Sequence, residues 1–209
     1  RTTIDAKTLK VLTPKEVVFE GGRSLSIETE KTDRYYVYGP YGIEGIFNSA
    51  ATAVSLGYRI SGVVTDGAGN YIWRKETRAT KNQISGMKEE GESAERGSLA
   101  VCMDAMLKNE GIIRNSESLL EEGESVVEIL KESLQDVTVL DLTGCNLDTV
   151  LYYVSHDIPV LVLLKDGNGM LVVGYDGYNT MLMDPKTARI YKGGFNDTSE
   201  WLEENGNVY

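Results

Sequence analysis

The sequence is poor in the residues that carry nucleophilic chemistry and covalent cross-links. Its 209 residues hold one histidine, His156, and two cysteines, Cys102 and Cys145. Two cysteines are too few for a disulfide framework, although a single bridge between them stays open, and they lack the spacing of a zinc site. The turn "YDGYN", residues 175–179, also lacks the alternating acids of a calcium loop. We therefore expect neither a metal ion nor a cofactor.

Long apolar runs and clusters of basic residues are also missing. The longest apolar run, residues 158–164, is the size of a strand, whereas a membrane span needs about 20 residues. The formal net charge is -11, with lysines and arginines scattered among acids, which disfavours a phosphate backbone or an anionic membrane as partner. We expect a soluble globular protein that contacts neither nucleic acid nor membrane. Because the chain starts at Arg1 rather than Met, we also expect a fragment of a longer protein.

What is present divides the chain into three parts. Residues 1–78 hold short strand-like runs followed by a small ββαββ module, residues 79–95 are polar and read as a linker, and residues 96–209 form a second domain. In the module, the alternating patterns and turn residues predict strands at 35–38, 42–47, 62–65 and 71–74, with a helix from Asn48 or Ser49 to about Tyr58.

The second domain reads as helices first and strands later. We expect a helix capped by Ser98 and ending near Gly111, and another opened by a capping box of Ser125 and Glu128. The remaining apolar patterns predict a strand at 137–142, a helix from 146, a strand from 159, two strands within 167–185 and a closing acidic helix. This order is typical of an α+β fold with helices packed on a mostly antiparallel sheet.

Three segments of this domain resemble a known family. They are "GSLAVCMDAMLKNEG", "VLYYVSHDIPVLVLL" and "MLVVGYDGYNTMLMDP". Together they are similar to the papain-like cysteine peptidases, and most of all to the bacterial peptidases that process double-glycine leaders of bacteriocins. The resemblance implies a papain-like fold and a bacterial surface or secreted protein, extracellular and of Gram-positive, Firmicutes origin.

The catalytic positions that the resemblance implies carry the wrong residues. Met170 stands where the family has its histidine base, and Asp184 stands where the carboxylate that orients that base is expected. Counting back 12 residues from Gly111 places Leu99 at the nucleophile, with Ser98 beside it. A thioether cannot take up a proton from a thiol. The sequence therefore predicts a degenerate, catalytically inactive peptidase-like domain.

Two readings compete with that prediction. Cys102 could be the nucleophile of an active cysteine peptidase, with His156 as base and Asp184 or Asp157 as the orienting group. However, Cys102 shares an apolar helical stripe with Leu99 and Met106, which favours burial and an inert thiol. The chain could also be a purely structural cell-surface module.

The function that we expect is recognition or scaffolding of a peptide or protein ligand. In this hypothesis Met170 and Leu99 form the apolar floor of the former substrate groove, since methionine suits adaptable apolar contacts.

Overall fold

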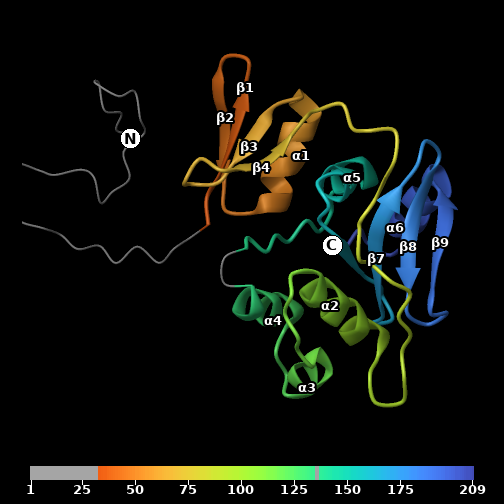
Figure 1. Ribbon diagram of the computed structural model, residues 1–209. Helices are drawn as coiled ribbons and strands as arrows, with labels where there is room; N and C mark the ends of the chain where they lie inside the picture. The colour runs from red at the N-terminus through yellow and green to blue at the C-terminus, as the bar shows by residue number, and fades with distance from the viewer. Residues whose placement is uncertain (1–32, 135–136) are drawn as a thin grey trace, which may run out of the picture. The chain divides into compact units, whose positions relative to one another are not determined.

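The computed structural model describes residues 33–134 and 137–209, and residues 33–209 form one compact unit. The predicted α+β class is confirmed, because the described residues form six helices and two antiparallel sheets (Figure 1). The helices are α1 (Ala50–Ile60), α2 (Ser98–Asn109), α3 (Ser116–Glu121), α4 (Val126–Ser133), α5 (Leu147–Ser155) and α6 (Phe195–Glu204). The strands are β1 (Tyr35–Gly39), β2 (Gly42–Phe47), β3 (Val63–Thr65), β4 (Tyr71–Arg74), β5 (Asn82–Gln83), β6 (Val160–Leu163), β7 (Gly169–Tyr175), β8 (Asn179–Asp184) and β9 (Arg189–Gly194). The strand-like runs expected before residue 33 lie outside the described residues.

The first sheet and α1 form the expected ββαββ arrangement. The strand order is β2-β1-β3-β4, so β2 and β4 are its edges. Ser49 caps α1 by accepting a hydrogen bond from the backbone N–H of Thr52 at 3.3 Å. Gly57 lets the helix approach the sheet closely, since a Cβ there would lie 2.7 Å from Cγ2 of Val64.

The second sheet is built around β7. Its order is β5-β7-β8-β9, and β6 also pairs with β7. Every residue of β7 is buried, because α2 and α5 pack against it while α6 packs on β8 and β9 (Figure 1). The run "GMLVVGY" is therefore apolar throughout rather than alternating, as is usual for a strand covered on both faces.

Three segments differ from the sequence-based expectation. The strand predicted at 137–142 is wrong: this stretch has no strand pairing and keeps an isolated hydrogen bond from the N–H of Leu142 to the carbonyl of Tyr209. The stretch 79–95, expected as a linker, contributes β5 to the second sheet and buries Ile84 and Met87. Helix α3 lies between the first two helices expected in the second domain, and the sequence did not predict it because six residues are too few to show a clear period.

One hydrophobic core joins the two sheets. Trp73 of β4 packs against Tyr58 of α1 and against Tyr152 of α5, with ring centroids 6.1 Å and 5.9 Å apart. Cys145 lies beside α1, where its Sγ is 3.7 Å from Oγ of Ser55. Both cysteines are buried and free, so the bridge left open by the sequence is not formed. In the described part of the chain, no helix has the length and apolar character needed to cross a membrane.

Candidate functional site

The start of α2 meets the start of β7. Ser98 is the first residue of α2 and is 2% exposed. Its hydroxyl donates a hydrogen bond to Oδ1 of Asn168 at 2.9 Å and accepts one from the backbone N–H of Gly169 at 3.1 Å. The expectation that Ser98 caps α2 is wrong, because this hydroxyl is engaged with β7 and the cap position is held by Gly97.

A glycine makes this close approach possible. A Cβ at Gly169 would lie 2.9 Å from Cα of Leu99 and 3.5 Å from Sγ of Cys102. Distances under 3.0 Å to a backbone atom require the backbone to shift, so a larger residue would push α2 away from β7. Gly169 therefore fixes the geometry of the junction between Ser98 and Asn168.

Met170 and Asp184 lie in the same region but face other partners. Met170 is 8% exposed, and the hydroxyl of Tyr191 lies 3.9 Å from its sulfur. The carboxylate of Asp184 accepts hydrogen bonds from the N–H of Lys186 and the hydroxyl of Thr187, both at 3.0 Å. Asp184 thus stabilises the turn that follows β8, and Met170 is part of the core rather than an open groove floor. Leu99 is only half-buried.

Cys102 lies one turn into α2 and is fully buried. Burial raises the pKa of its thiol far above the ordinary value, and the negative charge of Asp184 raises it further. Since only the thiolate is a nucleophile, this cysteine is inert at neutral pH. The burial expected from its apolar helical stripe is observed.

His156 lies at the other end of β7. It is the C-cap residue of α5, where Nδ1 is 2.8 Å from the carbonyl of Tyr152 and Nε2 is 3.1 Å from Oε1 of Glu76. The next residue, Asp157, accepts a hydrogen bond at 3.0 Å from Asn82, which pairs with Tyr175 at the end of β7.

This placement keeps the thiol and the imidazole apart. Cys102 contacts the start of β7, whereas His156 lies near its end. The strand spans seven residues, and at about 3.3 Å per residue its ends are roughly 20 Å apart. The structure therefore does not bring Cys102 and His156 together, and a proton transfer between them would need contact at about 3 Å.

Asn168 is the residue of this junction that the sequence reasoning missed. It follows the turn residues Asp166 and Gly167, and the N–H of Asn168 donates to Oδ1 of Asp166 at 3.1 Å. The segment "DGNG" before an apolar run signals a turn into a strand, but nothing local signals a partner 70 residues away. An amide has no titratable proton, so the pair of Ser98 and Asn168 can hold the two elements together but cannot activate a nucleophile.

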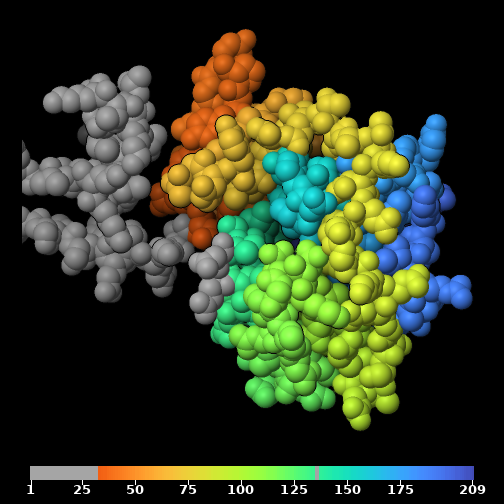
Figure 2. Space-filling view, viewed as in Figure 1, coloured from red at the N-terminus to blue at the C-terminus, as the bar shows by residue number. Residues whose placement is uncertain are grey.

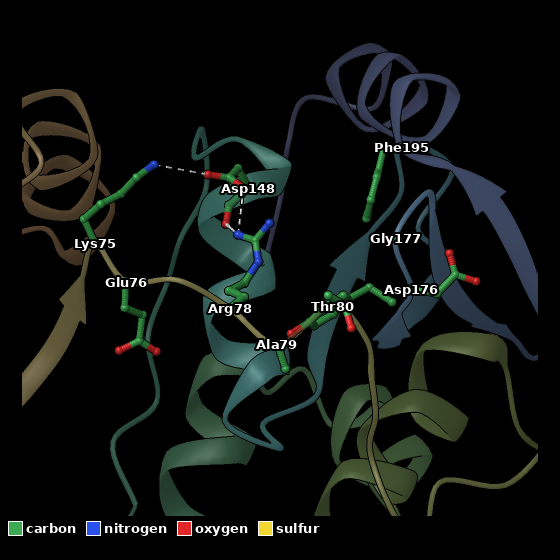
Figure 3. Close-up of a pocket in the computed structure, with 10 residues that line it drawn as sticks. Lys75, Glu76, Arg78, Ala79, Thr80, Asp148, Asp176, Gly177 and Phe195 are labelled. Carbon is green, nitrogen blue, oxygen red and sulfur yellow. Dashed lines mark hydrogen bonds and ion pairs between the residues drawn. The ribbon is translucent and has the colours of Figure 1, made fainter.

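A second feature is a cavity at the far end of β7. Its volume is about 290 Å³, and it is lined by Lys75, Glu76, Arg78, Ala79, Thr80, Asp148, Tyr175, Asp176, Gly177 and Phe195. Figure 3 shows Lys75 and Arg78 reaching toward Asp148, and Phe195 projecting into the space from α6. Nη1 of Arg78 lies 2.6 Å from Oδ1 of Asp148 and donates to the backbone carbonyl of that residue at 2.9 Å.

The charges around the cavity are largely paired. Nζ of Lys75 is 3.8 Å from Asp148, and Nζ of Lys192 is 2.7 Å from Asp176. The pKa of Asp176 is lowered, chiefly by its hydrogen bond with Lys192 and then by the N–H of Tyr178. Within residues 33–134 and 137–209, no group of three or more His, Cys, Asp or Glu side chains could hold a metal ion.

Comparison of the chain with protein-family models, with curated proteins and with solved structures found no match.

Proposed function

We propose that residues 96–209 form a catalytically inactive, papain-like domain, similar to the double-glycine leader peptidases, that recognises a peptide or protein segment on a bacterial surface or secreted protein. The observation that supports this most is the 2.9 Å hydrogen bond between Ser98 at the start of α2 and Asn168 at the start of β7. In the proposed family, the nucleophile opens the first helix and the base opens the strand that packs against it. In this chain the hydroxyl of Ser98 lies at the start of the helix, and Met170, the residue predicted at the position of the base, lies two residues after Asn168.

The chemistry of this pair explains the proposed inactivity. Ser98 donates its hydroxyl hydrogen bond to the amide oxygen of Asn168, and an amide is not a base that can remove the proton. Loss of the nucleophile or the base from a hydrolytic triad lowers turnover by about a millionfold. The buried Cys102 and the distant His156 offer no substitute. Recognition is the role that such a fold could retain without hydrolysis.

The ancestry part of the proposal is tested by rebuilding the pair. We expect the double variant Ser98→Cys, Asn168→His to have a thiol pKa about one unit or more below that of Ser98→Cys alone, because an imidazolium within hydrogen-bond distance stabilises the thiolate. The ultraviolet absorbance of the thiolate, followed against pH, measures this pKa. Cys102 and Cys145 do not interfere because burial raises the pKa of both thiols. Equal pKa values in the two variants would show that this junction is not built for a nucleophile and a base.

The recognition part is tested by peptide binding. Since Met170 is buried, half-buried Leu99 is the residue of the expected groove floor that a ligand could reach. A phage-displayed random nonapeptide library selected on the 209-residue chain should enrich a binder, and fluorescence anisotropy then gives its Kd. If no peptide is enriched, or if the wild-type chain cleaves peptides, the proposal is wrong.

A further inference from the structure

The segment that joins the two sheets has an unpaired backbone. Residues 76–81, "ETRATK", run from β4 to β5 and make no backbone–backbone hydrogen bond with any described residue. β4 is an edge of the first sheet and β5 an edge of the second. An edge strand and an unpaired extended segment both present N–H and C=O groups that another extended chain can bind.

Side chains hold this segment against α5. Glu76 pairs with His156 at the end of the helix, and Arg78 pairs with Asp148 in its first turn. These two anchors are two residues apart, as expected for an extended backbone that sends alternate side chains to the same face, and the chain bends only after them, at Thr80. Thr77, Ala79 and Thr80 are exposed, and Figure 2 shows this part of the chain on the surface beside α5. The backbone is therefore ordered in advance, which lowers the entropy lost on binding.

The cavity beside the segment limits what can bind. Its volume of about 290 Å³ is at the lower end for ligand pockets, which range from about 300 to 1,000 Å³, so it suits one large side chain better than a cofactor. Phe195 supplies an apolar wall, while Arg78 and Asp176 are already paired with Asp148 and Lys192. A charged side chain would find no unpaired counter-ion among these residues, whereas an aliphatic or aromatic one would pack on Phe195.

We propose that residues 76–81 bind an extended peptide segment of a partner protein, which adds as a strand and inserts one aliphatic or aromatic side chain into the cavity against Phe195. Residues 74–81 carry four basic side chains and one acidic side chain, which favours acidic residues on either side of the inserted side chain. The inference rests on the peptide recognition proposed above, but it moves the binding site from the start of β7 to its end.

The test uses two matched glycine variants of the 209-residue chain. A Cβ at Gly177 meets no atom within 4 Å, and a Cβ at Gly67 comes no closer than 4.0 Å to another atom, the carbonyl oxygen of Arg34. Gly177→Phe should fill the cavity and weaken the enriched nonapeptide at least tenfold, whereas Gly67→Phe should change its Kd less than twofold. Thermal unfolding of both variants checks that each is folded.

The backbone contribution is tested on the peptide itself. N-methylation of single amides of the nonapeptide should weaken binding at every second position, because only alternate N–H groups of an added strand face its partner. A peptide that binds Gly177→Phe as tightly as wild type, or that tolerates every N-methyl group, would overturn this inference. If the same peptide is instead weakened by Leu99→Gln, the recognition proposed at the start of β7 stands and only the site proposed here fails. If no peptide is enriched, both proposals fail.

Discussion

Replacement of Gly169 by alanine tests whether the approach of α2 to β7 is as tight as the structure shows. The added methyl group would lie 2.9 Å from Cα of Leu99 and 3.2 Å from its Cδ1. The first contact involves backbone, so α2 has to move rather than a side chain. Overpacking of this kind costs about 1–3 kcal/mol, and displacing Ser98 weakens hydrogen bonds worth about 1 kcal/mol each. We expect the free energy of unfolding to fall by about 3 kcal/mol.

Urea denaturation followed by circular dichroism measures this loss. With an m-value of about 2–3 kcal/mol per M, the midpoint should fall by about 1 M. Gly177→Ala is the matched control, because its Cβ meets no atom within 4 Å and alanine restricts the unfolded chain. Its midpoint should be unchanged or slightly higher. If Gly169→Ala unfolds at the same urea concentration as wild type, the junction is looser than described and Ser98 cannot be held as argued.

Three further predictions concern single side chains. Ser98→Ala leaves the N–H of Gly169 buried without its partner and should lower the free energy of unfolding by about 1–3 kcal/mol; an unchanged urea midpoint would contradict this. Ser125→Ala removes the capping box with Glu128 and should lower the free energy of unfolding by about 1 kcal/mol; urea denaturation measures this, and an unchanged midpoint would argue against the cap. For Cys102, burial raises the thiol pKa in the folded chain, so the unfolded chain loses this proton first. The contribution of this thiol to the free energy of unfolding is fully present below about pH 8.5, and it declines above that pH by about 1.4 kcal/mol per pH unit. Urea denaturation at several alkaline pH values should therefore show that the free energy of unfolding falls less steeply with pH in Cys102→Ala than in wild type. Equal slopes of this free energy against pH would refute the assigned burial.

Local patterns predicted the elements whose cause is local. The capping box of Ser125 and Glu128, the cap at Ser49 and the long apolar run of β7 depend on neighbours within a few residues, and all three are present. The strand predicted at 137–142 is absent because strand formation depends on residues far away in the chain. Its apolar residues resemble a strand, but a strand also needs a partner with a continuous ladder of hydrogen bonds. In this chain the backbone N–H groups of Leu142 and Gly144 each donate a single hydrogen bond to one of the last residues of the chain, so no continuous ladder forms.

The junction at the start of β7 could be predicted only in part. The sequence placed Ser98 and Met170 in the right elements and indicated a buried Cys102. It could not show that Ser98 would bind Asn168, because that contact depends on how closely α2 approaches β7. Counting residues from Gly111 pointed to Leu99, whereas Ser98 is the residue that makes the contact with Asn168. The side-chain contact itself depends on tertiary packing, which no local sequence pattern shows.

The tilted contact between the rings of Trp73 and Tyr152 makes the indole a reporter of cooperative unfolding. Trp73 is 2% exposed and lies between α1 of the smaller sheet and α5 of the larger one. Separation of the two sheets would expose the indole of Trp73 to water and move its fluorescence to longer wavelength, while the backbone of each sheet could stay intact. A red shift of Trp73 that coincides with the loss of circular dichroism would mean that the two sheets unfold as one cooperative unit.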